Sequence, residues 1–215
     1  MDCMLDMRRR GTMSLIILNG CSSAGKSSIA RHLQDRLEEP HLLIGIDHFF
    51  PMLPRRMFPM PGRTHEVSEG FYFETSVGGG ERLRCGGFGR KTIAAYHRAV
   101  AAIARMGVGL IVDDVVLDDE MRLDWLGALR DVEGYLVGVH CALDELERRE
   151  RARGDRMVGV ARAQFDQVHS EMIYDVEVDT STNDADSCAE QVCRALERRR
   201  PPGALARMRE RLRLR

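Results

Sequence analysis

The feature that most constrains the fold of this chain is a glycine-rich stretch, GCSSAGKSS, between a short apolar run and an amphipathic segment. The apolar run, residues 14–19 (SLIILN), is typical of a strand buried on both faces of a parallel sheet. In the segment that follows, Ile29, Leu33 and Leu37 recur at helical spacing and form one apolar stripe. A strand, a tight turn and a helix are therefore predicted to meet at this stretch.

The stretch matches the phosphate-binding pattern G-x-x-x-x-G-K-[ST] at every fixed position. Glycines let the backbone turn so that successive N–H groups face one anion, and the following helix adds unpaired N–H groups and a positive dipole end. Lys26 is placed to reach the β- and γ-phosphates, and the Ser27 hydroxyl to ligate Mg²⁺. The alternative, a chance glycine-rich turn, is disfavoured by the strand before it and the helix after it. We therefore expect ATP and Mg²⁺ to bind at Gly20, Cys21, Ser22, Ser23, Ala24, Gly25, Lys26, Ser27 and Ser28.

Apolar runs and helical stripes alternate along the rest of the chain. This alternation predicts an α/β fold of the P-loop NTPase type, with a parallel sheet of about five strands and helices on both faces. Ligands of such sheets bind beyond the carboxyl ends of the strands. The predicted strands are residues 14–19, 41–46, part of 108–117, 134–141 and 174–180, and the predicted helices are residues 26–37, 91–106, 143–153, 158–169 and 185–199.

The chain has 215 residues, and residues 13–200 are predicted to form a single domain. Residues 1–12 form an expected disordered leader, and Met13 could be the true start. Residues 51–89 are rich in Pro, Gly and Arg and lack periodicity, so we expect a functional, substrate-side insertion there. Residues 201–215 form a basic tail, which we interpret as a solvated helix end or a frayed terminus, with a basic interaction segment as the alternative.

Composition excludes several classes of protein. The formal net charge of -1 gives no whole-chain argument for a nucleic-acid partner, and no apolar run reaches the length of a membrane span. The six cysteines form no CxxC pair, so zinc-ribbon spacing is absent. One cysteine lies inside the glycine-rich loop, a poor place for a disulfide, so reduced thiols and a cytoplasmic location are the simpler interpretation. The oligomeric state cannot be read from the sequence.

Acidic residues follow two of the predicted strands. Asp113 and Asp114 end the run LIVDD, which is typical of a strand whose acid holds Mg²⁺ opposite the loop serine. Asp113 is the better candidate and Asp114 the alternative, while the simpler reading is an acid that caps the next turn. Asp47 ends the second strand and could orient an acceptor hydroxyl and take its proton, or could instead be the N-cap of the segment that follows.

The stretch RRERARGDR, residues 148–156, carries five arginines. Arg149 and Arg153 share one helix face, and Arg156 follows a Gly-Asp turn. Arginines on a mobile lid, here residues 143–157, stabilise the charge of a phosphoryl group in transfer. The alternative is a solvated basic helix that pairs with Glu145, Glu147 and Glu150 at helical spacings.

Taken together, the chain resembles the chloramphenicol phosphotransferase family. The matching pieces are IILNGCSSAGKSSIARHLQ, GIDHFFPMLP, IVDDV, VGVHC, RRERARGDR and VHSEMIYDVEVDT, which follow in order through most of residues 13–180. The resemblance implies a P-loop kinase fold and transfer of the γ-phosphate of ATP to a primary hydroxyl of the antibiotic. It implies that Asp47 is the general base and that Arg149, Arg153 and Arg156 are the lid arginines. Residues 51–89 diverge most, so the resemblance supports the kinase chemistry better than the identity of the acceptor.

Three functions remain open at this point. The first is an ATP-dependent O-phosphotransferase acting on a small-molecule hydroxyl, with a chloramphenicol-like antibiotic as the best candidate. The second is a nucleoside or nucleotide kinase, which shares the loop, the lid and the fold. The third is a P-loop ATPase that acts as a switch. The guanine-reading N-K-x-D motif is absent, because neither of the two asparagines precedes a lysine, so the sequence argues against a Ras-like GTPase.

Overall fold

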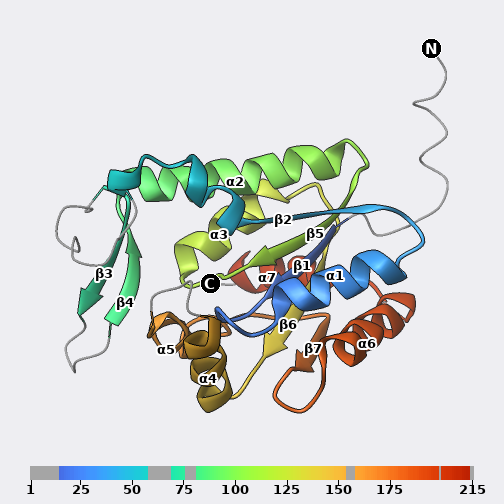
Figure 1. Ribbon diagram of the computed structural model, residues 1–215. Coiled ribbons are helices and arrows are strands. Elements are labelled where there is room, and N and C mark those ends of the chain that lie inside the picture. The colour runs from blue at the N-terminus through green and yellow to red at the C-terminus, as the bar shows by residue number, and fades with distance from the viewer. Residues whose placement is uncertain (1–14, 58–68, 76–80, 154–157, 199, 214–215) are drawn as a thin grey trace.

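The computed structural model describes residues 15–57, 69–75, 81–153, 158–198 and 200–213 (Figure 1). At its centre lies a five-stranded sheet in which every neighbouring pair of strands is parallel. This confirms the predicted α/β fold. In spatial order the strands are β2 (His41–Gly45), β5 (Gly109–Asp114), β1 (Leu15–Asn19), β6 (Tyr135–His140) and β7 (Val176–Asp179).

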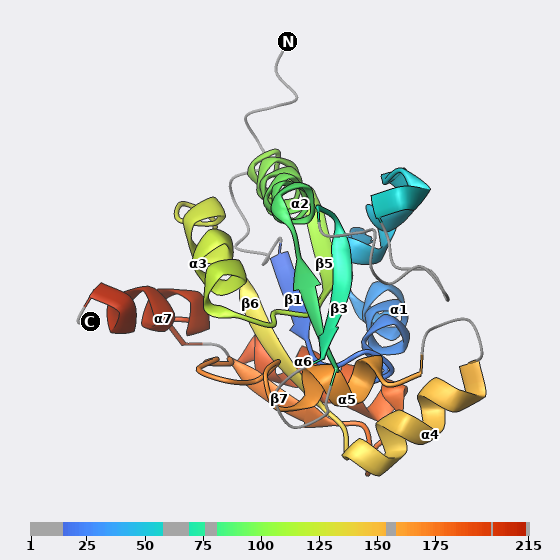
Figure 2. The same cartoon turned by 90° about the vertical axis from the view of Figure 1, so that its left-hand side faces the viewer.

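Helices cover both faces of the sheet. The central strand β1 carries apolar side chains on each of its two faces, and both faces have to be shielded from water. Ile16 and Leu18 pack into a core with helices α1, α4, α5 and α6, whereas Leu15 and Ile17 pack into a second core with α2, α3 and α7. The two groups of helices lie on opposite sides of the sheet in Figure 2. Their bounds are α1 (Lys26–Arg36), α4 (Leu143–Arg153), α5 (Val160–Phe165) and α6 (Ala185–Glu197) on one face, and α2 (Gly87–Arg105), α3 (Asp119–Ala128) and α7 (Ala204–Arg213) on the other.

The described part of the insertion has its own secondary structure. Three short 3₁₀ segments follow β2, namely η1 (Ile46–His48), η2 (Phe50–Met52) and η3 (Arg55–Met57). They are followed by an antiparallel hairpin of β3 (Phe71–Thr75) and β4 (Glu81–Cys85). The hairpin stands apart from the main sheet beside the start of α2 (Figure 1).

Two helices, α2 and α5, differ from the predicted ones by more than two residues at one end. α2 begins at Gly87 rather than at residue 91, because the preceding backbone is held to the hairpin by a bond from the Gly86 N–H to the Gly70 carbonyl at 2.7 Å. α5 is limited to Val160–Phe165, shorter than residues 158–169. Its N-cap, Gly159, has a φ of 102°, and this left-handed conformation sets where the helix begins.

Helix α3 is absent from the predicted set. The Asp118 side chain caps it by accepting a hydrogen bond from the Met121 N–H at 2.8 Å. The helix buries Arg122 and exposes Leu123, so its sequence lacks a clean apolar stripe. That mixed pattern explains why periodicity did not reveal it.

The interpretation of residues 201–215 as a solvated helix end or a frayed terminus is wrong for α7. Ala204, Leu205 and Met208 are buried in the core that α2 and α3 also line. The N–H of Ala204 donates to Asp175 at 2.8 Å, which anchors the start of the helix. The three apolar residues lie at helical spacing between arginines, and the abundance of arginine hides their stripe.

Within the described residues, none of the helices combines the length and the apolar character needed to cross a bilayer.

The packing of α7 predicts a stability cost. Leu205 is 5 % exposed, and its Cδ1 lies 2.9 Å from the point where a Cβ on Gly134 would stand. Leu205→Ala should lower the free energy of unfolding by about 2–4 kcal/mol, because it leaves a cavity under the helix. Chemical denaturation measures this change. The matched control Leu123→Ala removes a leucine that is 50 % exposed and should have an effect within about 0.5 kcal/mol. Equal effects of the two variants would contradict the packing of α7.

Candidate active site

The glycine-rich loop joins the carboxyl end of β1 to α1, and its two glycines have different roles. A Cβ on Gly20 would stand 2.4 Å from the Val139 carbonyl oxygen, so Gly20 allows β1 and β6 to approach closely. Gly25 has a φ of 88° and is the N-cap of α1. No acidic residue occupies the first turn of α1, so the positive end of the helix faces the loop without a carboxylate of its own.

Lys26 is the first residue of α1, and its side chain is buried against the loop that precedes it. Its Nζ donates to the carbonyl oxygens of Gly20 at 2.9 Å and Cys21 at 2.8 Å, and lies 3.5 Å from Asp113 Oδ1. The side chain is only 6 % exposed. These contacts hold the ammonium group at the mouth of the loop, where it can meet a phosphate.

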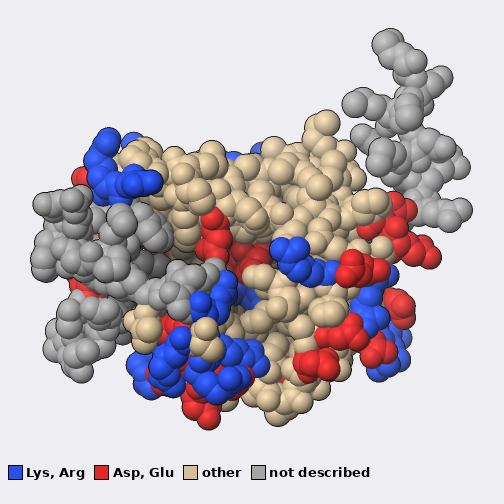
Figure 3. Space-filling view, viewed as in Figure 1, with Lys and Arg blue, Asp and Glu red and all other residues tan. Residues whose placement is uncertain are grey.

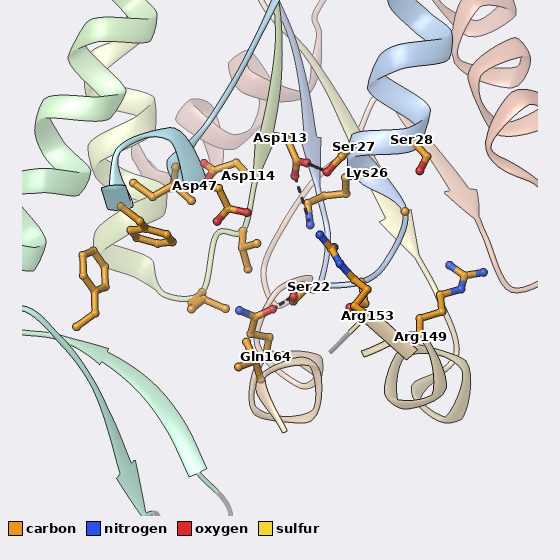
Figure 4. Close-up of a pocket in the computed structure, with 18 of the residues that line it drawn as sticks. Ser22, Lys26, Ser27, Ser28, Asp47, Asp113, Asp114, Arg149, Arg153 and Gln164 are labelled. Atoms are coloured by element: carbon orange, nitrogen blue, oxygen red, sulfur yellow. Dashed lines mark hydrogen bonds and ion pairs between the residues drawn. The ribbon is translucent and has the colours of Figure 1, made fainter. Parts of the chain in front are cut away.

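Ser27, in the first turn of α1, faces Asp113, near the end of β5. The Ser27 hydroxyl donates to Asp113 Oδ2 at 2.5 Å, and Figure 4 shows the pair beside Lys26. The parallel register, which pairs Leu18 with Asp113, carries this carboxylate to the edge of the loop. One hydroxyl and one carboxylate suit Mg²⁺, which prefers to share its coordination with waters and substrate phosphates. No cluster of three or more metal-ligating His, Cys, Asp or Glu side chains occurs among the described residues, so a metal here would depend on such phosphates.

Asp114 has a different partner. Successive residues of a strand point to opposite faces, and the Asp114 carboxylate accepts a hydrogen bond from Trp125 Nε1 at 2.5 Å. It is 4 % exposed, and burial raises its pKa. The structure therefore places Asp113, and not Asp114, against Ser27.

Two of the loop side chains provide a test of whether an anion fits. The Ser23 Oγ is buried and has no hydrogen-bond partner among the described residues, and Ser23 has a φ of 65°. A buried hydroxyl without a partner carries a free-energy cost that a ligand oxygen would remove. The Cys21 thiol is buried, and burial raises its pKa to about 11, so it stays protonated and does not oppose an anion. The loop fits a phosphate.

Side chains far along the chain hold the loop in place. Gln164, on α5, accepts a hydrogen bond from the Ser22 N–H at 2.7 Å. Thr180, directly after β7, donates to the Ala24 carbonyl oxygen at 2.9 Å. Both side chains are buried. Sequence reasoning missed them: Gln164 carries no signal of its own, whereas the place of Thr180 after a parallel strand could have drawn attention to it.

The arginines of α4 divide into two groups. Arg149 donates to the Thr180 carbonyl oxygen at 2.7 Å and to the Thr180 hydroxyl at 3.1 Å, which places it at the edge of the loop. Figure 4 shows Arg153 extending from α4 toward Lys26. Arg148 and Arg151 are exposed and form ion pairs along the helix, as the solvated-helix interpretation expects. Arg156 lies outside the described residues.

Glu145 and Glu150 support this arrangement in different ways. Glu145 accepts hydrogen bonds from Arg148 and Arg149, which lower its pKa to about 2, so it is charged and fixes the Arg149 guanidinium. Glu150 is buried and accepts from the N–H groups of Gly159 and Ala161 at 2.7 and 2.9 Å. It therefore ties the end of α4 to the start of α5, across residues 154–157.

A cavity of about 1450 Å³ runs from the loop toward the insertion. The loop, Arg149 and Thr180 line one end of it. Figure 3 shows acidic groups in the hollow at the centre of this face and basic groups gathered below it, over α4 and α5. Apolar and aromatic side chains line the other end, from Phe50, Phe71, Ile93, Val115, Leu117 and Met121.

Asp47 lies in this same cavity, in η1 directly beyond β2. Its side chain is exposed, and Figure 4 shows it with Asp114 between the aromatic side chains and the loop. It is not the N-cap of the segment that follows, because Gly45 is the N-cap of η1 and Phe49 that of η2. A carboxylate between a phosphate loop and an apolar pocket can orient a hydroxyl and accept its proton.

Comparison with known proteins agrees with this site. A family model described as "Chloramphenicol phosphotransferase-like protein" matches residues 13–197. A relative from Mycobacterium tuberculosis, provisionally named an O-phosphotransferase, is 32% identical over 202 residues, which cover 92% of this chain and 88% of the relative.

Solved kinase structures share the fold at low sequence identity. A sugar kinase from Janibacter superposes with a TM-score of 0.57 at 15% identity, covering 86% of this chain and 95% of its own. A gluconokinase from Sinorhizobium meliloti gives 0.56 at 18%, covering 88% and 94%. The APS kinase of Mycobacterium tuberculosis, in complex with AMPPNP and APS, gives 0.52 at 16%, covering 86% and 98%. The fold is that of the P-loop kinases, and the chain belongs to the chloramphenicol phosphotransferase-like family.

Proposed function

We propose that the protein is an ATP-dependent O-phosphotransferase that moves the γ-phosphate to a hydroxyl of a small molecule. The observation that carries the proposal is the single cavity in which the phosphate loop and Asp47 lie, with an apolar pocket beyond Asp47. A nucleotide at the loop and an alcohol in the pocket would meet at this carboxylate. The family to which the chain belongs supports phosphoryl transfer as the reaction.

In the proposed step, the acceptor oxygen forms a bond to the γ-phosphorus while the bond from that phosphorus to the β–γ bridging oxygen breaks. The hydroxyl proton passes to Asp47, and ADP leaves. Lys26, Arg149 and Arg153 balance the negative charge on the phosphoryl oxygens. The same role for Arg156 rests on the family resemblance alone.

Ser27 and Asp113 would hold Mg²⁺ together with oxygens of the nucleotide. Bound there, the ion would supply positive charge to the phosphates. Asp113 is proposed for this role in preference to Asp114, because Asp113 contacts Ser27 whereas Asp114 is occupied by Trp125.

The acceptor end of the cavity favours an uncharged acceptor with an apolar body, of the chloramphenicol type. Its walls are aromatic and aliphatic, and Asp47 and Asp114 add negative charge. Among the described residues that line this end, Arg55 is the one arginine or lysine, and burial lowers the pKa of the other basic side chain, His97. An anionic acceptor such as a nucleotide would need several cations there, so the nucleotide-kinase alternative is disfavoured.

The direct test is incubation of the protein with MgATP and a panel of hydroxyl compounds that includes chloramphenicol. Mass spectrometry should detect an acceptor that gains one phosphoryl group, in step with ADP formation. Release of ADP and free phosphate with every acceptor would instead favour the ATPase alternative.

Asp47→Asn should lower kcat by about 10²–10⁴-fold, because the amide can still orient a hydroxyl but cannot accept its proton. ATP binding, measured by calorimetry, should stay within about twofold of wild type. The matched control Asp35→Asn changes an exposed carboxylate on α1 and should leave both quantities unchanged. Full turnover by Asp47→Asn with a confirmed acceptor would refute the base assignment.

The two neighbouring aspartates should differ in their effect on Mg²⁺. Asp113→Asn should raise the Mg²⁺ concentration needed for half-maximal turnover by about tenfold or more, because it removes a carboxylate ligand. Asp114→Asn keeps an oxygen that can accept from Trp125 and should leave the Mg²⁺ requirement near that of wild type. A larger shift for Asp114→Asn than for Asp113→Asn would reverse the assignment.

A further inference from the structure

Tyr96, on α2, is a fully buried residue whose hydroxyl has no partner among the residues that the structure describes. Its exposure is 0%, and its Oη has no hydrogen bond to any described residue. Tyr96 also lines the large cavity that contains Asp47 and the phosphate loop. Buried hydroxyl groups in folded proteins are nearly always hydrogen-bonded, so an unpaired one at the wall of a cavity calls for a partner from that cavity.

Neighbouring rings fix the side chain in this position. The ring of Phe49 lies 5.2 Å from the Tyr96 ring, centroid to centroid, at an interplanar angle of 65°, and that of Trp125 lies 5.6 Å away at 79°. The ring of His97 is 5.4 Å away. Edge-to-face packing of this kind leaves the phenol little freedom to turn toward another partner within the protein.

The surroundings keep the hydroxyl protonated. Burial, followed by the negative charges of Asp114, Asp113 and Asp47, raises the pKa of Tyr96 well above its usual value. All three carboxylates line the same cavity as Tyr96. The Tyr96 hydroxyl is therefore a protonated donor in the wall of the cavity that contains Asp47.

We propose that Tyr96 is an acceptor-binding residue, whose hydroxyl donates a hydrogen bond to a second polar atom of the molecule that Asp47 activates. The inference rests on the proposed function and extends it to the acceptor. It selects alcohols that carry a further oxygen or nitrogen lone pair near the reactive hydroxyl, such as diols, hydroxy amides or hydroxy ethers, over simple alcohols. Two fixed points, Asp47 and Tyr96, would then hold the acceptor in one orientation.

The variant Tyr96→Phe removes one oxygen atom and retains the packed ring. For an acceptor found by the panel, kcat/KM should fall about tenfold, chiefly through a higher KM, while the KM for ATP stays unchanged. Without ligands, the Tm of Tyr96→Phe should equal or exceed that of wild type, because the Tyr96 hydroxyl makes no hydrogen bond to any part of the chain that the structure describes. The matched control Tyr135→Phe, on β6 and outside the lining of this cavity, should leave kcat/KM and the KM for ATP unchanged.

A second comparison tests the contact itself. The acceptor and an analogue without its second polar group are each assayed with wild type and with Tyr96→Phe. Wild type should discriminate between the two compounds by about tenfold and Tyr96→Phe by less than about twofold, because deleting either partner removes the same hydrogen bond.

The outcomes separate the inference from the proposed function. Equal kcat/KM for wild type and Tyr96→Phe, or a clearly lower Tm of the variant at unchanged kcat/KM, would overturn the acceptor role and leave the phosphotransferase intact. Absence of phosphoryl transfer by wild type to every acceptor would overturn the proposed function, and the acceptor role of Tyr96 with it.

Discussion

The contact between Ser27 and Asp113 joins the start of α1 to the sheet on which the site is built. Ser27 lies in the first turn of α1, and Asp113 lies near the end of β5, the strand beside β1, so their hydrogen bond fixes the loop against β5. Lys26 strengthens this arrangement by lying between two loop carbonyl oxygens and the same carboxylate. Because β2 pairs with β5 on its other side, this position also determines where Asp47 emerges. β5 therefore fixes the position of both the phosphate end and the acceptor end of the cavity.

The nucleotide end depends on residues from the second half of the chain. Gln164 and Thr180 bond the backbone of the loop, and Arg149 bonds Thr180 in turn. α4 and α5 are joined by Glu150 across residues 154–157. A displacement of α4 would therefore act on Arg149 and Thr180 before it reached the loop. α4 is therefore bonded to the phosphate loop through Thr180, whereas a simple lid would only cover the loop.

The sequence was sufficient for the sheet, most of the helices and the place of the phosphate loop, because buried strands and helical stripes leave strong periodic signals. It was insufficient for α3, whose buried arginine and exposed leucine blur the stripe, and for α7, whose apolar residues lie among arginines. Within the site, Asp47 and Asp113 could be selected because they follow strands. Gln164 and Tyr96 could not, because their importance comes from contacts between distant elements, and an unpaired hydroxyl is visible only in three dimensions.

Because of helix α7, the end of the match to the family model and the end of the hydrophobic core lie at different residues. The match to the family model ends at residue 197, whereas the hydrophobic core continues through Met208. Leu205 lies against Gly134, directly before β6, and Leu205 and Met208 pack in the core that α2 and α3 also line. The segment that the family model matches is therefore shorter than the segment that shares one hydrophobic core. A domain border drawn at the end of that match would cut through a continuous core.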